Sequence, residues 1–592
     1  MHMNTKFLNE PHASMREKRR QRLFELALEA VDGGIQPFDR EHLLIRQRPD
    51  CGPSPHRPGL IVAQQTPEYA VALMESGRDP ELGVRIIDRL LDYQCVDPNR
   101  YDYGNWLWVH GWERAVDTNA VGMILPALAH VMLHHAPLLD DALRDRLLRA
   151  FELAGHGLLG MRFSTAYTNM HVRRMLGLFY VAHFTNNERL RELAYWDWVE
   201  WTQEIVLHSF NEYLSPTYTG TNLSALELLA EAPGVTPEFQ QHVQQIITIL
   251  WAQMLDWYHP PSTKLIGPFA RCYDPRLLPN GPDIGVSQLF WREFEGLEPE
   301  PLPSTVCVRW AASRWTMPEE IRQQLSNRRW PHRAEERTPF WPGDHRSCYQ
   351  TELFALGVKL RGENGAPSAT PLFLAWKDTH VRRTLYLRDE MSGVSVHHAT
   401  QADHRVLGAC QLHQPQPNEN PPKLPVFWGL HPPRPLPETV TNAFHLGACE
   451  QVVMESAEGR IAPNVPVRWQ VGPIACAWQW LPRNPKNTEA RLIRRDGEWV
   501  LEISMRTHAL PPGDGEAFAY AFLVNPRGES TAMSPIEVSN DTADDWSLRA
   551  LLDGDEVGLC VPLTKPAHHQ SRDVLVTEET YFGVSPFVNV PP

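Results

Sequence analysis

The stretch Glu298-Pro299-Glu300-Pro301-Leu302-Pro303 separates two parts of the chain that differ in hydrophobic period. Three prolines in six residues are incompatible with a regular helix or a central strand. Before this stretch apolar residues recur at three- and four-residue spacing, whereas after about residue 345 they form short β-branched or aromatic runs. The change of period predicts an α+β multidomain chain, with a helical domain and linker at residues 1–320 and a β domain at residues 321–592.

The first part reads as a succession of helices joined by short polar breaks, with no strand expected between them. A series of antiparallel helix pairs builds a solenoid or a closed α/α toroid, and the lack of a fixed repeat disfavours the solenoid families. Between residues 274 and 343 one further helix is expected at Pro318–Leu325, and the rest is interpreted as a linker. The predicted helices are Arg22–Val31, Glu68–Glu75, Leu82–Tyr93, Ala120–His134, Asp141–Leu159, His171–His183, Glu188–Val206, Leu223–Glu231 and Pro237–Trp257.

The second part is expected to be an antiparallel β-sandwich, because no crossover helices separate its strands. Arg495-Asp496-Gly497-Glu498 lies between two of these strands and is a strong hairpin signal, since Asp-Gly suits a two-residue turn. The predicted strands are Leu353–Leu360, Leu372–Trp376, Thr384–Leu387, Val467–Trp480, Ala490–Ile493, Trp499–Met505 and Ala517–Val524.

Composition narrows the classes of partner. A net charge of −15 argues against nucleic acid, because phosphate-binding surfaces need a basic excess. The 20 Trp and 15 Tyr suit stacking on flat ligands such as sugar rings. No run reaches the roughly 18 apolar residues of a membrane span, and no apolar segment follows the basic residues near the N-terminus, so the cytoplasm is expected. The nine cysteines show no close pairing and are expected to be reduced thiols.

The run Asn211-Glu212-Tyr213-Leu214-Ser215-Pro216-Thr217-Tyr218-Thr219-Gly220 gathers two phenols, a carboxylate and several hydroxyls around one proline. Buried hydroxyls and carboxylates are unfavourable unless each finds a partner, so this composition is not that of a core. Two interpretations are open: a polar turn, or an active-site loop. In both, the preceding helix ends near Tyr213 and the next begins near Asn222.

Three further segments carry groups suited to binding or proton transfer. Asn169, His171 and Arg173 stand at a helix start, where Asn169 also fits an N-cap, His171 a core histidine and Arg173 a solvated charge. Arg271 and Tyr273 are interpreted as ligands for an anionic group. The closely spaced Trp106, Trp108 and Trp112 form either a sugar-stacking wall or an aromatic core plug, at comparable odds.

The Asn169–His171 segment, the Tyr-rich run and the following β part together resemble the α/α-toroid polysaccharide lyases of the heparinase II/III and alginate lyase type. The resemblance covers nearly the whole chain in architecture, but rests on short motifs. It implies that Asn169 neutralises a uronate carboxylate, that His171 is the base, and that Tyr218 is the acid, with Tyr213 as the alternative. The family also has a histidine in its β domain, for which His345 is the nearest candidate here.

This chemistry needs no metal and no organic cofactor. The C5 proton of a uronic acid becomes acidic when the negative charge of the sugar's carboxylate is paired. The further negative charge that forms as this proton leaves is then stabilised by groups already in position. An imidazole, whose pKa lies near the working pH, suits removal of this proton. A phenol whose pKa is lowered by nearby cations suits protonation of the leaving oxygen. The expected partner is an acidic oligo- or polysaccharide.

Two other functions remain open from the sequence. One is a glycoside hydrolase on the same helical scaffold, in which Glu212 works with Glu113 or Asp117 as the second carboxylate. The other is a carbohydrate-binding protein without turnover. The fold alone does not choose among the three.

Overall fold

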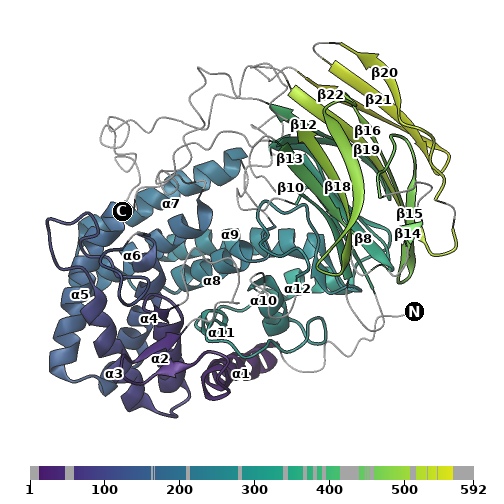
Figure 1. The fold of residues 1–592 in the computed structure, drawn as a ribbon. Coiled ribbons are helices and arrows are strands. Elements are labelled where there is room, and N and C mark those ends of the chain that lie inside the picture. Colours follow the sequence, from purple (N-terminus) through teal and green to yellow (C-terminus); the bar gives the residue numbers. More distant parts are fainter. Residues whose placement is uncertain are drawn as a thin grey trace.

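The computed structural model describes residues 12–46, 59–115, 117–161, 165, 167–208, 214–277, 283, 285–337, 345–363, 370–377, 383–389, 395–413, 439–446, 449, 452–453, 459–506, 515–529, 531–542 and 545–563. Helices come first and the large sheet second, as the change of hydrophobic period predicts (Figure 1). The helices are α1 His12–Asp32, α2 Gln65–Glu75, α3 Pro80–Leu90, α4 Ala120–His134, α5 Asp141–Gly160, α6 Thr168–Thr185, α7 Glu188–His208, α8 Tyr218–Ala230, α9 Pro237–Trp257, α10 Gly285–Glu293, α11 Cys307–Ala311 and α12 Glu319–Ser326.

The predicted ends hold for some of the long helices and fail for α1, which begins at His12 instead of the predicted Arg22. Both ends of Ala120–His134 and of Pro237–Trp257 are as predicted. At the start of α9 the Thr236 side chain accepts a hydrogen bond from the Phe239 N–H, and Pro237 occupies the first helical position. Pro needs no N–H donor there, and a Thr cap satisfies one of the unpaired donors.

Two predictions about the helical part are wrong. Short strands do interrupt it: β1 Phe38–Asp39, β2 Leu44–Arg46 and β3 Leu60–Ile61 form one small sheet, and β4 Tyr258–His259 pairs with β5 Lys264–Leu265. Strands of two or three residues are too short to show alternation. The stretch interpreted as a linker also contains α10 and α11, two short helices whose residues are almost all buried, polar ones of α10 included.

The strands of the second part form a 14-stranded sheet and a separate 3-stranded sheet. Every strand pairing in the described residues is antiparallel, as predicted. The strands are β6 His332–Arg337, β7 His345–Gln350, β8 Phe354–Glu363, β9 Leu372–Trp376, β10 Arg383–Asp389, β11 Ser395–Ala402, β12 Arg405–His413, β13 Thr439–His445, β14 Val452–Val453, β15 Val467–Val471, β16 Ile474–Pro482, β17 Thr488–Arg495, β18 Glu498–Arg506, β19 Gly515–Pro526, β20 Glu537–Asp541, β21 Asp545–Leu552 and β22 Asp555–Pro562.

The large sheet curves so that strands from its two ends face each other. The Phe444 ring of β13 lies 5.4 Å from Trp478 of β16 and 5.0 Å from Tyr520 of β19, measured between ring centroids. The predicted hairpin joins β17 to β18, with Arg495 opposite Glu498. Asp496 and Gly497 both have positive φ, at 50° and 85°, as a two-residue hairpin turn requires.

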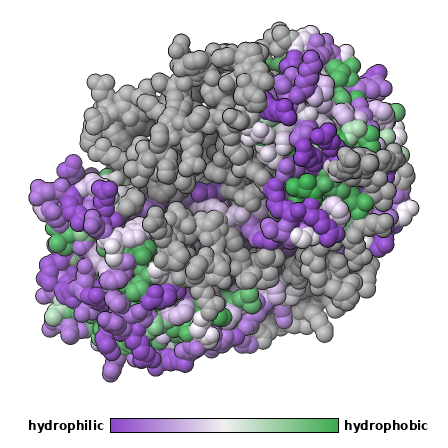
Figure 2. All heavy atoms as spheres, in the orientation of Figure 1, coloured by the Kyte–Doolittle hydropathy of each residue, from purple (hydrophilic) through white to green (hydrophobic). Residues whose placement is uncertain are grey.

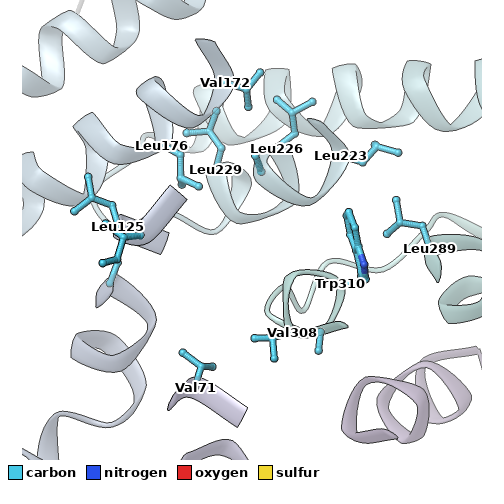
Figure 3. Packing of buried hydrophobic residues seen from close by; sticks show 14 of the residues in the cluster. Val71, Leu125, Val172, Leu176, Leu223, Leu226, Leu229, Leu289, Val308 and Trp310 are labelled. Atoms are coloured by element: carbon cyan, nitrogen blue, oxygen red, sulfur yellow. The ribbon is translucent and has the colours of Figure 1, made fainter. Parts of the chain in front are cut away.

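The helices share one apolar core, which continues onto one face of the sheet. Figure 3 shows its centre, where side chains of α2, α4, α6, α8, α10 and α11 converge, among them Val71, Leu125, Leu226 and Trp310. The same cluster includes Phe373 and Ala375 of β9. Burial of this apolar surface holds the helical part against the sheet.

A connecting strip, residues 258–277, lies along the seam between helices and sheet. Phe269 and Thr370 exchange backbone hydrogen bonds of 3.1 and 3.0 Å. Gly267 and Gly357 approach so closely that a Cβ on Gly357 would lie 1.6 Å from the Gly267 carbonyl oxygen. The strip is therefore fixed to β8 and to the segment that precedes β9 by backbone contact, which leaves its side chains available to the helical side.

Among the described residues, no helix is both long enough and apolar enough to span a membrane. Figure 2 shows hydrophobic residues scattered among hydrophilic ones on the face in view.

Acid is expected to weaken the seam through His259. Its ring joins Ser262 Oγ and the Thr351 carbonyl, at 2.8 Å each, and burial lowers its pKa to about 3. An unfolded histidine has a pKa of about 6.5. The unfolded chain therefore takes up the proton first, so this contribution is complete above pH ~6.5 and is lost as the pH falls towards 3. At pH 5 the loss is about 2 kcal/mol.

The measurement compares urea midpoints at pH 7.5 and pH 5. His259→Gln keeps an amide donor for the Thr351 carbonyl but has no side chain that takes up a proton between pH 7.5 and pH 5. The urea midpoint of this variant should therefore fall less between the two pH values than that of the wild type. His156→Gln, at an exposed position of α5, serves as the control and should follow the wild type. Equal acid losses in His259→Gln and wild type would contradict the assignment.

Candidate functional site

The start of α8 is held by its own loop and by α10. Leu214 has φ of 48°, and the Ser215 hydroxyl oxygen accepts a 3.1 Å hydrogen bond from the Tyr218 N–H. A Cβ on Gly220 would lie 2.8 Å from the Gly285 backbone, so these two glycines permit close approach of α8 and α10. The helix begins at Tyr218, four residues before the predicted start; its N-cap Thr217 makes no side-chain cap hydrogen bond, and the Ser215 hydroxyl, on the other side of Pro216, pairs with the Tyr218 N–H instead.

Tyr218, Tyr273 and Arg271 form what we call the tyrosine–arginine cluster. The two phenol oxygens are hydrogen-bonded to each other. The Arg271 guanidinium lies over both rings, 4.9 Å from the centroid of Tyr218 and 5.1 Å from that of Tyr273. All three side chains are half-buried, so a ligand can reach them from solvent. The structure thus brings together three residues that the sequence places in two separate segments.

Asp283 ties the two segments of this cluster together. Its carboxylate accepts a 2.5 Å hydrogen bond from the Thr217 hydroxyl, beside Tyr218, and another of 2.5 Å from the Asp274 N–H, beside Tyr273. Burial raises the pKa of the Asp283 carboxyl, whereas these hydrogen bonds oppose the rise. One buried side chain therefore sets the distance between the two phenols.

The sheet contributes a tyrosine and a histidine close to this strip. Thr384 of β10 donates a 3.1 Å hydrogen bond to the Pro275 carbonyl. Two residues further on, and thus on the same face, Tyr386 stacks on His445 of β13, with ring centroids 4.5 Å apart. His445 was not among the residues singled out from the sequence. Only the pairing of β10 with β13 brings it here, and the sequence carries no sign of that pairing.

Asn169 and His171 lie on the first turn of α6 and are buried. Asn169 is not the N-cap, because the helix begins at Thr168 and Tyr167 precedes it. His171 is 3 % exposed, and its Nε2 lies 3.1 Å from the Asp197 carbonyl oxygen of α7. Burial lowers the pKa of His171, so the ring is neutral at pH 7. The roles of Asn169 as neutraliser and His171 as base stay predictions.

Arg173 is buried, contrary to the interpretation of a solvated charge. Its Nε finds no hydrogen-bond partner within the described part of the chain. The pKa of Arg173 is lowered to about 9, chiefly by burial and to a smaller extent by the positive charge of Arg309. The negative charge of Glu68 acts in the opposite direction. Arg309 is ion-paired with Glu68. Arg173 therefore lies near a second guanidinium group, and the carboxylate that opposes both charges is paired with Arg309.

Trp106 and Trp108 belong to the core. Trp106 is fully buried and donates its indole N–H to the Leu90 carbonyl at 3.1 Å, and Trp108 is 2 % exposed and donates to the Asp117 carbonyl at 2.8 Å. Buried rings cannot stack on a sugar, so the predicted binding role is wrong for these two and the core-plug alternative holds. Trp112 is half-buried, and its role as a sugar platform stays a prediction.

The remaining predicted residues are dispersed. His345 lies on the β6–β7 hairpin, where its Nε2 is 2.5 Å from the Glu335 carboxylate. Burial raises the pKa of Asp117, a carboxylate of the hydrolase alternative, to about 6. Glu113 is exposed. Glu212 and Tyr213 fall outside the described residues.

Comparison with known proteins matches part of the chain to a family. The sequence model of a family described as Domain of unknown function (DUF8769) matches residues 53–278, a span that includes Tyr218, Arg271 and Tyr273. No curated protein matches the chain.

Several solved structures are similar in overall arrangement. A crystal structure of heparinase III is 10 % identical, with a TM-score of 0.49 over 92 % of this chain and 91 % of that one. Heparan sulfate lyase from Pedobacter heparinus is 11 % identical, with a TM-score of 0.38 over 94 % of both chains. Chondroitin AC lyase of Streptomyces coelicolor A3 is 10 % identical, with a TM-score of 0.36 over 92 % and 89 %.

Proposed function

We propose that the protein is a polysaccharide lyase that cleaves a uronic-acid-containing glycan by β-elimination. The tyrosine–arginine cluster carries the proposal. Two hydrogen-bonded phenols under one guanidinium, each side chain partly exposed, provide a proton donor, a proton acceptor and a positive charge within reach of a single sugar residue.

In this proposal Arg271 pairs with the uronate carboxylate, which lets negative charge gather as the C5 proton leaves. Tyr218, entering the step as a phenolate, accepts the C5 proton; the C–H electron pair forms the C4=C5 double bond as the C4–O bond breaks, and the proton passes from Tyr218 to the departing oxygen. Tyr273 shares that proton through the bond between the two phenol oxygens. His445 and the Arg276–Asp274 pair, joined at 2.8 and 2.9 Å, line the same strip and are proposed to contact neighbouring sugar residues.

The finer architecture belongs to the same proposal. The helices are proposed to form an α/α toroid and the curved sheet a sandwich, with the division between them near residue 320. The last helix of the helical part ends at Ser326 and the first strand of the large sheet begins at His332.

The experiment mixes the protein with uronate polymers such as heparan sulfate, chondroitin or alginate. A lyase leaves an unsaturated uronate at the new non-reducing end, so ultraviolet absorbance should rise together with the number of reducing ends. New reducing ends without the absorbance rise would establish hydrolysis instead. Binding without either product would establish a carbohydrate-binding protein.

The raised pKa of Asp117 is the observation that favours hydrolysis as the second candidate. A carboxyl with a pKa of about 6 is protonated in part near neutral pH and can act as a general acid. In that case Asp117→Asn would abolish activity, whereas in the lyase it should leave most of the turnover intact.

A further inference from the structure

A histidine pair at the end of α4 meets a glutamate at the end of α2. His130 lies in the last turns of α4, and His135 is the residue that follows the helix. Glu75 is the last residue of α2. The His130 Nε2 lies 2.7 Å and the His135 Nε2 3.3 Å from Glu75 Oε1. One ligand atom from each of the three side chains can be chosen so that all lie within 4.8 Å of one another.

We propose that Glu75, His130 and His135 bind a Zn²⁺ ion that joins the carboxyl ends of α2 and α4. Two imidazoles and one carboxylate are a ligand set that zinc takes. Ligand atoms about 2.0–2.1 Å from a tetrahedral zinc lie roughly 3.3–3.4 Å apart. The His135–Glu75 distance has this value already, and the other two need only small side-chain rotations.

The way α4 ends makes the pair possible. On a continuing helix, residues five apart point about 140° away from each other. His135 leaves the helix with φ of −124° and ψ of 15°, and its ring turns back to within 5.7 Å of the His130 ring, measured between centroids. The termination of the helix, rather than its surface, therefore creates the site.

The charges around the carboxylate are compatible with a cation. Arg20 of α1 lies 3.5 Å from the second oxygen, Oε2, and leaves Oε1 to the two imidazoles. Arg20 also pairs with Glu17 at 3.0 Å, so part of its positive charge is balanced away from the site. Metal-binding carboxylates are commonly held by such an outer contact.

A water molecule would complete the tetrahedral set. The His134 ring packs on His130, with ring centroids 4.6 Å apart, but it does not belong to the group of ligand atoms that lie within 4.8 Å of one another. The ion would join α2 to α4 beside α1, so its role is to stabilise this corner of the helical part, and the proposal is independent of the lyase activity.

The test is a calorimetric titration of chelator-treated, full-length protein with Zn²⁺. The wild type should take up one ion at this site, and zinc should raise its melting temperature. His135→Gln replaces a half-buried ligand outside the helix and should weaken this binding by roughly 100-fold or more, above the 10–100-fold typical of outer contacts. The melting shift should disappear with it.

His242→Gln, at an exposed position of α9, is the matched control and should bind as the wild type does. Cobalt gives a second readout that needs no variant: Co²⁺ in the wild type should show the strong visible absorption of a four-coordinate site. Absence of saturable zinc uptake by the wild type would overturn the proposal. So would equal uptake by His135→Gln and wild type, because zinc would then sit on other groups.

Discussion

Tyr218→Phe is expected to lower the turnover of a uronate polymer by roughly 10²–10⁴-fold, the range typical of lost general acid–base catalysis. The substitution removes the hydroxyl that bonds to Tyr273 and keeps the ring beneath Arg271. Folding stability should change little, because the phenol is half-buried and the ring packing is retained. The measurement is kcat from the ultraviolet absorbance of the product, together with a thermal melt of each variant.

Two comparisons make this result specific. Tyr103→Phe alters another half-buried phenol, which packs on His156, and should keep normal turnover. Glu212→Gln should also retain substantial activity if Glu212 only orients the loop before α8. A Tyr218→Phe enzyme with near-normal turnover beside an inactive Glu212→Gln enzyme would reverse the mechanism in favour of hydrolysis.

Arg292→Leu is expected to destabilise the protein by about 3–5 kcal/mol. Arg292 is fully buried, donates to both oxygens of Glu227 at 2.9 and 2.6 Å, and donates to Glu293 at 2.6 Å. Its removal leaves Glu227 buried without this cation. Arg16 still pairs with Glu293, at 2.9 Å. The measurement is the midpoint of urea unfolding at pH 7.5.

The double variant Arg292→Leu/Glu227→Leu separates the buried charge from the lost packing. Removing both partners takes away the uncompensated carboxylate, so most of the lost stability should return. Arg191→Leu breaks an exposed pair with Glu188 and should cost less than about 1 kcal/mol. A double variant as unstable as Arg292→Leu would show that the guanidinium acts by packing.

The order of helices and strands could be predicted because hydrophobic period is a local property. α4, α9 and the β17–β18 hairpin each carry their pattern and their terminal signals within the segment itself. α10 was missed because it has only nine residues and because its polar side chains Gln288, Arg292 and Glu293 are buried together with its apolar ones. β1 and β3 have two residues each, which leaves no alternation to detect.

The site was predictable only in part, for a related reason. Tyr218 stands in a run rich in polar side chains, and Arg271 and Tyr273 bring a cation and a phenol into one short segment, so all three were visible as candidates although parts of both segments are buried. A Trp-rich segment such as that of Trp106 and Trp108 has the same sequence whether its rings face a sugar or the core. Only the burial of the rings in the structure decides between the two roles. His445 depends on a strand pairing across more than fifty residues, which no short motif encodes.

The close backbone contact between Gly267 and Gly357 affects when enzymatic activity can return during refolding. Tyr218 belongs to a helix, and Tyr273 to a strip that is fixed to the sheet by the Phe269–Thr370 backbone bonds. Both phenols belong to the helical half and are linked through Asp283, but the strip that carries Tyr273 gains its contacts with the sheet only after the helices and the sheet have docked. Turnover should therefore be the last property regained during refolding, after the helical signal has returned, and a slow rise of activity would time the docking step itself.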